Sequence, residues 1–488
     1  MRYLFSIAAG AVVAWSFYPN HWWAAILGMA ILLGSLDSQP RRTRLKMTAL
    51  FALTYFGFHV QWVSSLGNDA WFALTLICAL PWIIFGLLNV DSKSNWFYFQ
   101  PAALVVVLEV IRANWPWGGL PWGLVAYSQL DGPLVKLSTL GGQAIVSGVV
   151  VVCAAALLKL IKQRSLTAVL LVAICMLTAR SVDVFHSSET VTLSAVQGNV
   201  PRVGNTLSAQ RAAVLNNHVA GTEKLLSDIK LGVTPSPDLI VWPESGTDID
   251  PLAPGIAADE INRLSASTEI PILIGGTTFF GGTLSNGEDL TAVGPRNVGI
   301  LWSAESGPGE MYVKRHPLPF GEYLPMRDFL ARYIKRFDQI PNDFVAGNKV
   351  GVFNVGDKKI GDVICFEIAY ANLVYDTITA GAQVMVVQTN NSTFGNSTQP
   401  EQQFAITRFR AIESQRAFLV ASTSGISGLI RNDGEVLSKT AQFESAIVTG
   451  EVELISEKTF VNRYPHWVLV VSILVLIGRY RSSRGRKP

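Results

Sequence analysis

The chain has 488 residues, of which 49% are hydrophobic and only 15% are charged. Soluble domains usually carry about 25% charged residues, so this composition and the mean hydropathy of +0.32 indicate a membrane protein. The net charge of +3 is too small to argue for a nucleic-acid partner, and the sequence has neither a glycine-rich phosphate loop nor a Cys/His set spaced for a metal.

Seven apolar segments fill residues 1–183, and an eighth lies in residues 464–488. Each is close to the roughly 20 residues that a helix needs to cross a bilayer. We predict eight transmembrane helices, near residues 3–18, 22–37, 47–65, 70–90, 96–112, 135–158, 165–181 and 465–478. The first segment has only Arg2 as a basic flank and no persuasive cleavage site, so we do not interpret it as a signal peptide.

Basic residues collect in alternate loops between these segments. They are Arg41, Arg42, Arg44 and Lys46, then Lys93, then Lys159, Lys162 and Arg164. Because cytoplasmic loops are rich in Lys and Arg, the pattern predicts a cytoplasmic N-terminus. Residues 184–463 then form a domain on the outer face of the cytoplasmic membrane. The last helix returns the chain to the cytoplasm, where the basic tail lies (Arg479, Arg481, Arg484, Arg486 and Lys487).

The loop at residues 114–123 is too broken by Pro and Gly for a regular helix. Its three tryptophans, Trp117 among them, suit either an interfacial aromatic belt or a surface that faces a substrate. Just before it, Glu109 and Arg112 are three residues apart and would share a helix face, where they could pair. We interpret both as structural.

The outer segment has a different pattern, with short β-type runs separated by helical stretches. The β-type runs are residues 192–196, 239–242, 270–275, 363–368 and 384–387, and the helical stretches include residues 208–229 and 401–414. Residues 354–359 read as a hairpin turn. This alternation predicts an α/β domain, and about 280 residues suffice for one well-buried core.

Three reactive side chains in this domain follow β-type runs. Cys365 ends one run, Glu244 follows another after Trp-Pro, and Lys314 follows a third. A thiol, a carboxylate and an ammonium group supply a nucleophile, a general base and a stabiliser of an oxyanion, which is the set that acyl transfer through a thioester requires. The other three cysteines lie inside apolar runs, which leaves Cys365 without a disulfide partner in the polar segment.

Each residue also has a structural interpretation. A lone Cys is among the most buried residue types, Glu244 could cap a helix, Lys314 could end a solvated strand, and Glu322 could be an ordinary loop acid. These separate interpretations do not explain why all three reactive groups occupy rigid strand exits marked by Pro or Gly.

The motifs W-P-E-S, K-R-H-x-x-P-F-G-E and C-F-E resemble those of the nitrilase superfamily, whose Glu–Lys–Cys triad acts in a four-layered αββα sandwich. Such a domain between seven N-terminal helices and one C-terminal helix is similar to the apolipoprotein N-acyltransferase family, a membrane-embedded branch of that superfamily. The resemblance covers essentially the whole chain. It implies a polytopic helical membrane domain (residues 1–183), an extracytoplasmic nitrilase-like domain (184–463), and a last helix with its tail (464–488).

The resemblance also implies roles for single residues. Glu244 would be the general base, Lys314 the oxyanion-stabilising cation and Cys365 the acyl-accepting nucleophile. Glu322 matches the family's second glutamate, and Phe366 and Glu367 match positions that shape the site. Further candidates for substrate binding are Trp117, Trp242, Asn390 and Phe394.

The loop at residues 389–395 departs from the family's usual S-N-D-x-W-F-G pattern. Asn391 stands where Asp is usual, Thr393 where Trp is usual, and Gln403 replaces a common His. These changes leave the triad intact and concern the shape of the acyl or lipoprotein pocket. The later R-A-x-E-x-x-R pattern, with Arg410 and Glu413, is expected to brace the core.

The activity implied is transfer of a fatty acyl chain from a membrane phospholipid, through a thioester on Cys365, to the α-amino group of a diacylglyceryl-cysteine at the N-terminus of an apolipoprotein. The resemblance implies no metal and no organic cofactor. Two alternatives remain at this point. One is a membrane-tethered amidase in which water resolves the thioester, and the other is a noncatalytic membrane scaffold.

Overall fold

The computed structural model describes residues 1–200, 207–279, 294–339 and 342–484. The chain divides into two compact units. The first comprises Met1–Val184, Ile412–Ser414 and Thr459–Pro488, and the second comprises Phe185–Ala411 and Gln415–Lys458. Of the basic tail residues, Arg486 and Lys487 lie outside the described residues.

The first unit is helical, and a helix lies at each of the eight positions predicted from the apolar segments. The helices are α1 (Arg2–Trp15), α2 (Trp22–Leu36), α3 (Arg41–His59), α4 (Asn68–Phe85), α5 (Phe99–Asn114), α6 (Ser138–Gln163), α7 (Leu166–Arg180) and α14 (Trp467–Arg484), with the short α13 (Phe460–Arg463) before the last. Their ends differ from the predicted ends by a few residues, most at α3, whose basic first turn belongs to the helix.

Two helical segments of the described chain are long and apolar enough to cross a membrane, Asn68–Phe85 and Val135–Gln163. Three others, Arg2–Trp15, Trp22–Leu36 and Leu166–Arg180, are apolar but shorter. The structure therefore bears out the positions of the eight helices, whereas the number that span a bilayer stays a prediction.

The loop that follows α5 is held by the two charged residues at the end of that helix. The Arg112 guanidinium donates to the carbonyl oxygens of Leu120, Trp122 and Gly123 at 2.6–3.0 Å, and Glu109 Oε1 accepts from the backbone N–H of Val125 at 2.8 Å. The buried carbonyl and N–H groups of an irregular loop need hydrogen-bond partners. These contacts explain why an apolar helix carries the charged residues Glu109 and Arg112 near its end. They agree with the structural role predicted for both residues.

The second unit contains two six-stranded sheets. The first has the order β12-β1-β2-β3-β4-β5 and the second β11-β10-β9-β8-β7-β6. The strands of the first are β1 (Thr190–Gln197), β2 (Leu239–Val241), β3 (Ile272–Thr278), β4 (Arg296–Ser303), β5 (Gly307–Val313) and β12 (Ala446–Glu453). Those of the second are β6 (Val352–Val355), β7 (Lys358–Ile364), β8 (Val384–Thr389), β9 (Phe418–Ser422), β10 (Gly428–Ile430) and β11 (Val436–Lys439).

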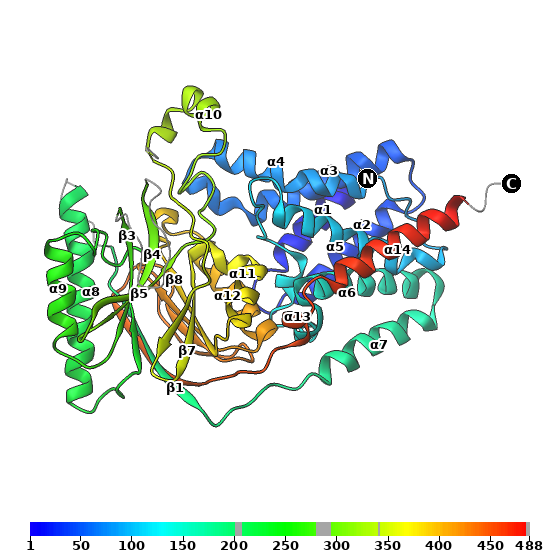
Figure 1. Cartoon of the computed structure of the whole chain (residues 1–488). Helices are drawn as coiled ribbons and strands as arrows, with labels where there is room; N and C mark the ends of the chain where they lie inside the picture. The colour runs from blue at the N-terminus through cyan, green and yellow to red at the C-terminus, as the bar shows by residue number, and fades with distance from the viewer. Residues whose placement is uncertain (201–206, 280–293, 340–341, 485–488) are drawn as a thin grey trace. The chain divides into compact units, whose positions relative to one another are not determined.

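Helices cover the outer face of each sheet, so the unit is a four-layered αββα sandwich (Figure 1). Helices α8 (Leu207–Lys230) and α9 (Ile256–Ser265) pack on the first sheet, and α11 (Ala371–Thr379) and α12 (Gln399–Ser414) on the second. The short α10 (Arg327–Tyr333) projects from the sandwich. The predicted α/β class is correct, and the two apolar clusters between helices and sheets form its cores.

One predicted strand differs in its end. The sequence predicts strand through residues 363–368, but β7 stops at Ile364 and Cys365–Ala369 forms a short 3-10 helix. The predicted hairpin at residues 354–359 is present, because β6 and β7 pair antiparallel with Val355 opposite Lys358. The apolar run in the sequence extends beyond the end of β7 because the residues of the 3-10 helix are buried as well.

Strands β1, β2 and β3 run parallel in the first sheet, and β7, β8 and β9 run parallel in the second. The carboxyl ends of parallel strands meet at one edge of a sheet, where side chains can converge. Residue 275 in β3 shows how closely the backbone approaches there. A Cβ atom on Gly275 would lie 2.1 Å from the carbonyl oxygen of Pro243 and 3.0 Å from Cα of Glu244.

Replacing Gly275 with Ala should therefore destabilise the second unit, because the obstructing atoms belong to backbone and cannot rotate away. Overpacking of this kind costs about 1–3 kcal/mol of unfolding free energy. Thermal unfolding of the purified protein measures it. Gly57→Ala is the control, since a Cβ there has no neighbour nearer than 3.9 Å. Equal melting temperatures for both variants would contradict the close approach.

Candidate active site

The three predicted reactive groups each follow the end of a strand. Glu244 lies three residues after β2, Lys314 directly follows β5, and Cys365 directly follows β7. Cys365 has a φ of 58°, a left-handed conformation that residues other than Gly rarely adopt. The backbone turns sharply at this residue, so the thiol stands at the strand end instead of continuing the alternation of the sheet. Strain of this kind is often found at functional sites.

Lys314 is buried between two carboxylates. Its Nζ lies 3.2 Å from Glu244 Oε1 and 2.9 Å from Glu322 Oε1, and only 2% of the residue is exposed. Burial alone would lower the pKa of Lys314, but the charges of Glu244 and Glu322 outweigh it and hold that pKa well above its usual value. The side chain is therefore a fixed cation at this site.

Two further groups hold the Glu244 carboxylate in place. Asn297 Nδ2 donates to Glu244 Oε1 at 2.6 Å and to Glu322 Oε1 at 2.8 Å, and the backbone N–H of Asn390 donates to Glu244 Oε2 at 2.7 Å. Thr423 Oγ1 also donates to the Glu244 carbonyl oxygen at 2.9 Å. Asn297 lies in β4, between the strands that carry Glu244 and Lys314, and had no distinguishing signal in the sequence.

Cys365 is a neutral thiol in this arrangement. Burial raises the pKa of the thiol well above its usual value, the Glu244 charge raises it further, and Lys314 opposes them only in part. Thr389 Oγ1 lies 3.4 Å from Sγ and Gln403 Nε2 donates to the Cys365 carbonyl oxygen at 3.2 Å. A reaction at this sulfur therefore needs a base that removes the proton, and Glu244 supplies a carboxylate.

Glu367 joins the turn of Cys365 to the strand exit of Lys314. This fully buried carboxylate accepts from the backbone N–H groups of Ile364, Arg315 and His316 at 2.7–2.9 Å and from the hydroxyl of Tyr312 at 2.8 Å. Arg410 completes the turn by donating to the carbonyl oxygens of Ile368 and Ala369. These contacts support a positioning role for Glu367 and the bracing role expected of Arg410.

Comparisons with known proteins agree with this arrangement. Residues 9–156 match the family described as the apolipoprotein N-acyltransferase N-terminal domain, and residues 213–458 match the carbon-nitrogen hydrolase family. The chain is 32% identical to the apolipoprotein N-acyltransferase of Mycolicibacterium smegmatis over 97% of this chain and 83% of that one. The chain belongs to the apolipoprotein N-acyltransferase family. Membership in this family makes it an acyltransferase with a nitrilase-like domain.

A second relative, the apolipoprotein N-acyltransferase of Pseudomonas paraeruginosa, is 29% identical over 99% of this chain and 97% of that one. Among solved structures, Saccharomyces cerevisiae Nit3, described as a member of the nitrilase superfamily, has 16% sequence identity and a TM-score of 0.39 over 55% of this chain and 91% of that one. A structural likeness this low carries no functional argument.

Trp242 does not fit the substrate-binding role predicted for it. Its side chain has no exposed surface, and it packs in the core between the first sheet and helix α8. Its ring nitrogen donates to Thr222 Oγ1 at 2.9 Å, and its ring lies 5.5 Å from that of His218. The residue is structural because successive residues of a strand face opposite sides of the sheet, which turns Trp242 toward the helix.

The other candidates divide between the two units. Phe366 and Phe394 are both buried, with ring centroids 5.8 Å apart, next to the turn of Cys365. Asn390 acts through its backbone on Glu244, while its side-chain oxygen accepts from the N–H and hydroxyl of Ser392. Trp117 is half-buried in the helical unit. Substrate contact by Asn390, Phe394 and Trp117 stays a prediction.

Two of the three departures from the family pattern, Asn391 and Gln403, belong to one network of side-chain amides. Asn391 Nδ2 donates to Gln399 and Gln403, at 2.9 and 2.8 Å, and Gln403 Nε2 donates to Thr389 Oγ1 at 2.9 Å. Gln403 therefore fixes the two groups that surround the sulfur, Thr389 and the Cys365 carbonyl. Among the described residues no group of three or more His, Cys, Asp or Glu side chains is placed to hold a metal ion.

Asp362, another buried carboxyl group, lies between the sheets. A Cβ atom on Gly299 would lie 2.6 Å from both Asp362 Oδ2 and Gln388 Oε1, so these two oxygens converge, and neither has a hydrogen-bond partner among the described residues. The Gln388 oxygen is fixed because its Nε2 donates to the Trp242 carbonyl at 2.6 Å. An oxygen that faces another oxygen in a dry core is favourable only if a proton or water lies between them.

Burial raises the pKa of Asp362 well above its usual value, and the charges of Glu367 and Glu244 raise it further. The folded protein thus keeps a proton on Asp362 that the unfolded chain releases above about pH 4. Where the folded state binds more protons, stability falls as pH rises.

Asp362→Asn should remove this pH dependence, because the amide can donate to Gln388 without titrating. The unfolding free energy of the variant relative to the wild type should increase steadily between about pH 5 and about pH 8, by at most about 1.4 kcal/mol per pH unit. The difference between the two melting temperatures should increase in the same direction. Thermal unfolding over this range measures the trend. Asp357→Asn, with a side chain that is 95% exposed, is the control and should show none. A constant difference for Asp362→Asn would contradict the buried proton.

Proposed function

We propose that the chain transfers a fatty acyl group from a membrane phospholipid, through a thioester on Cys365, to the α-amino group of the diacylglyceryl-cysteine at the N-terminus of an apolipoprotein. The observation that carries the proposal is the buried Glu244–Lys314–Glu322 cluster next to a thiol on a left-handed turn. Membership in the apolipoprotein N-acyltransferase family supports the choice of substrates.

In the first half-reaction, Glu244 takes the thiol proton and the Cys365 sulfur attacks the carbonyl carbon of a phospholipid ester. Lys314 stabilises the negative charge that develops on the carbonyl oxygen. When the tetrahedral intermediate collapses, the bond to the lipid oxygen breaks, Glu244 returns its proton to that oxygen, and a lysophospholipid leaves. The acyl group remains on Cys365 as a thioester, and Glu244 is again a carboxylate.

In the second half-reaction, the α-amine of the acceptor attacks the thioester carbonyl. Lys314 again stabilises the oxyanion, and Glu244 takes the proton that the amine loses. The carbon–sulfur bond then breaks, the acceptor leaves with the acyl group bound to its nitrogen as an amide, and Glu244 returns the proton to the Cys365 sulfur. Glu322 accepts hydrogen bonds from Lys314 and Asn297, and Asn297 also donates to Glu244, so these contacts hold the base and the cation in place during both steps.

We propose further that all eight apolar helices cross the cytoplasmic membrane of a bacterium, with both termini inside the cell and the catalytic unit on the outer face. The alternation of basic loops supports this orientation, and the relatives named above are bacterial proteins. A location in the membrane suits the reaction, since both substrates carry acyl chains whose exposure to water would be unfavourable.

Intact mass spectrometry after incubation with defined phospholipids tests the first half-reaction. The wild type should gain a fatty-acyl mass that hydroxylamine removes. Cys365→Ser should gain no hydroxylamine-sensitive mass, and Glu244→Gln should acquire the adduct about 10²–10⁴ times more slowly, since a general base contributes that much.

Matched controls separate these effects from damage to the fold. Cys175→Ser removes another free cysteine and Glu305→Gln an exposed acid, and both should acylate as the wild type does. Absence of any adduct on folded wild-type protein, with hydrolysis of a small amide instead, would refute the acyltransferase mechanism on this site and favour an amidase.

Lys314→Ala should slow formation of the acyl-enzyme by about 10²–10³, the usual consequence of removing one stabiliser of an oxyanion. The rate of lysophospholipid release in a single turnover measures the loss, and thermal unfolding shows whether the variant is folded. Lys335→Ala, which removes an exposed lysine, should leave the rate unchanged. A folded Lys314→Ala protein with the wild-type rate would exclude Lys314 from the reaction.

A further inference from the structure

The end of β8 places a hydroxyl group against the sulfur of Cys365. Thr389 is the last residue of this strand, and its Oγ1 donates to Cys365 Sγ at 3.4 Å. The residue before it, Gln388, turns its side chain between the sheets, toward the Trp242 carbonyl and Gly299. Successive residues of a strand face opposite sides of a sheet, so Thr389 faces helix α12. The hydroxyl is buried there, since Thr389 is 2% exposed.

The hydrogen of this hydroxyl group points at the sulfur because Oγ1 accepts a hydrogen bond from another direction. Gln403 Nε2 in α12 donates to Thr389 Oγ1 at 2.9 Å. A threonine hydroxyl carries one hydrogen, and among the described residues Cys365 Sγ is the acceptor within its reach. The same Nε2 donates to the Cys365 carbonyl oxygen at 3.2 Å. One amide group thus holds the turn that carries the sulfur and the hydroxyl group that faces it.

Neighbouring side chains fix the direction in which the Gln403 amide points. Its Oε1 accepts from Asn391 Nδ2 and from Gln399 Nε2, both at 2.8 Å. If the amide were rotated by half a turn, its NH₂ group would face these two donors and its oxygen would face the Cys365 carbonyl oxygen. Asn391 is held in turn, since its Oδ1 accepts from Ser422 Oγ at 3.1 Å. The network therefore determines the direction of each hydrogen bond up to the sulfur.

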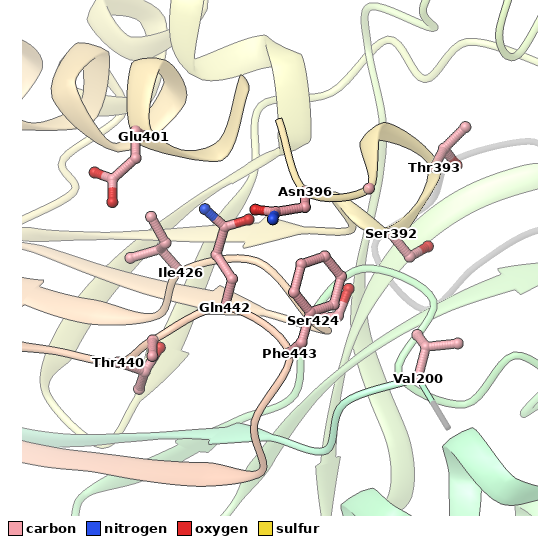
Figure 2. Close-up of a pocket in the computed structure, with 12 residues that line it drawn as sticks. Val200, Ser392, Thr393, Asn396, Glu401, Ser424, Ile426, Thr440, Gln442 and Phe443 are labelled. Carbon is pink, nitrogen blue, oxygen red and sulfur yellow. The ribbon is translucent and has the colours of Figure 1, made fainter. Parts of the chain in front are cut away.

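This network is buried and uncharged. No member is more than 3% exposed, and all are hydroxyl or amide side chains, namely Thr389, Asn391, Gln399, Gln403 and Ser422. The loop leaves the network after Asn391, because residues 392–396 border a separate pocket that no network residue lines (Figure 2). Hydroxyl and amide groups do not titrate near neutral pH. The hydrogen bond to the sulfur therefore persists while the proposed base gains and loses a proton.

We infer that the Thr389 hydroxyl is a catalytic residue that stabilises the Cys365 thiolate, and that Gln403 is the positioning residue that directs this hydroxyl. The inference rests on the proposed function, in which the sulfur carries negative charge as it attacks the phospholipid and again as it leaves the acceptor. A hydrogen bond to a charged acceptor is stronger than one to a neutral acceptor. The bond therefore strengthens in both steps, and the hydroxyl keeps its own proton throughout. Lys314 has a different role, at the charge on the carbonyl oxygen.

The first test compares two substitutions of Thr389. Thr389→Val removes the hydroxyl and keeps the shape of the side chain. It should slow both acyl-enzyme formation and acyl transfer to an amine about tenfold, the lower end of the effect of a hydrogen bond to a charged group. Single-turnover release of lysophospholipid measures the first step, and transfer from acyl-enzyme prepared beforehand measures the second. Thr389→Ser keeps the hydroxyl and should keep nearly the wild-type rates.

Thr377→Val is the matched control for loss of a buried threonine hydroxyl. Thr377 is 2% exposed, and its Oγ1 donates to the Leu373 carbonyl oxygen within α11. This variant should keep the wild-type rates, and thermal unfolding shows that each variant is folded. A folded Thr389→Val protein with wild-type rates in both steps would overturn the inference.

A vibrational measurement tests the hydrogen bond without any reaction. The S–H stretching band of Cys365 is the difference between the infrared spectrum of a protein and that of the same protein carrying Cys365→Ser. A hydrogen bond to the sulfur changes the strength of the S–H bond. The band should therefore move in Thr389→Val and keep its wild-type position in Thr389→Ser. A band that stays in place in Thr389→Val would overturn the inference.

Gln403→Met tests whether Gln403 acts through Thr389, because it removes the amide and nearly keeps the length of the side chain. It should slow acyl-enzyme formation in the wild type, and slow it much less in protein that already carries Thr389→Val. Gln399→Met, which removes one of the two donors to the Gln403 oxygen, is the milder variant and should show the same dependence on Thr389. Effects that simply multiply with that of Thr389→Val would overturn the positioning role.

These results separate the inference from the proposed function. If acyl-enzyme forms equally fast in wild type and Thr389→Val, the role of Thr389 is wrong and the proposed function stands. If the wild type forms no acyl-enzyme from phospholipid but hydrolyses a small amide through Cys365, the proposed function is wrong. A roughly tenfold slower hydrolysis by Thr389→Val would then show that the role of Thr389 stands.

Discussion

The active site depends on one buried ammonium group held between two carboxylates. Taking Lys314 out of water costs several kcal/mol, and only close opposite charges with satisfied hydrogen bonds can offset that cost. Glu244 and Glu322 provide the charges, and Asn297 binds both carboxylates from the intervening strand β4. Each group is thereby fixed by the others, which is what a reaction needs when charge develops at a defined point. The same hydrogen bonds and charges therefore stabilise the cluster and hold its groups in the positions that the proposed reaction needs.

The proposed nucleophile, Cys365, comes from the other sheet, so the sandwich itself must fix its position. Glu367 binds backbone N–H groups on both sides, at Ile364 beside the sulfur and at Arg315 beside the lysine. Deeper between the sheets, Gln388 joins the end of β8 to the carbonyl of Trp242, two residues before Glu244. These side chains add to backbone hydrogen bonds between segments that flank the two sheets, such as the bond from the Asn199 N–H to the Thr423 carbonyl oxygen. The relative position of the thiol and the proposed base is therefore set in part by buried polar side chains.

The sequence identified Glu244, Lys314 and Cys365 as candidates because each follows the end of an apolar run, where composition changes abruptly; their roles in a reaction stay a proposal. The sequence indicated the α/β class and the helix positions for the same reason. What it did not reveal depends on contacts distant in the chain. Asn297 is the second residue of β4, after Arg296, and its partners are 53 and 25 residues away. The end of β7 was misplaced because the 3-10 helix of Cys365 is as buried as the strand before it. Trp242 was misassigned because the sequence does not distinguish a tryptophan that packs in the core against helix α8 from one that faces a ligand.

In the proposed mechanism, the charge of the cluster lets one carboxylate serve two different nucleophiles. Lys314, Glu244 and Glu322 together carry a net charge of −1, and the buried Glu367 carboxylate lies beside Arg315, the residue after Lys314. Moving the thiol proton from Cys365 to Glu244 does not change that total, so the buried site gains no charge when the sulfur becomes nucleophilic. The acceptor amine, by contrast, is an ammonium ion in neutral water, so it must release one proton to solvent before it attacks. In the proposed mechanism the negative charge of the site attracts that cation, and Glu244 stays a carboxylate that takes the second proton when the neutral amine attacks the thioester. The second carboxylate, Glu322, would thus favour an amine over water, because water gains nothing from the charge.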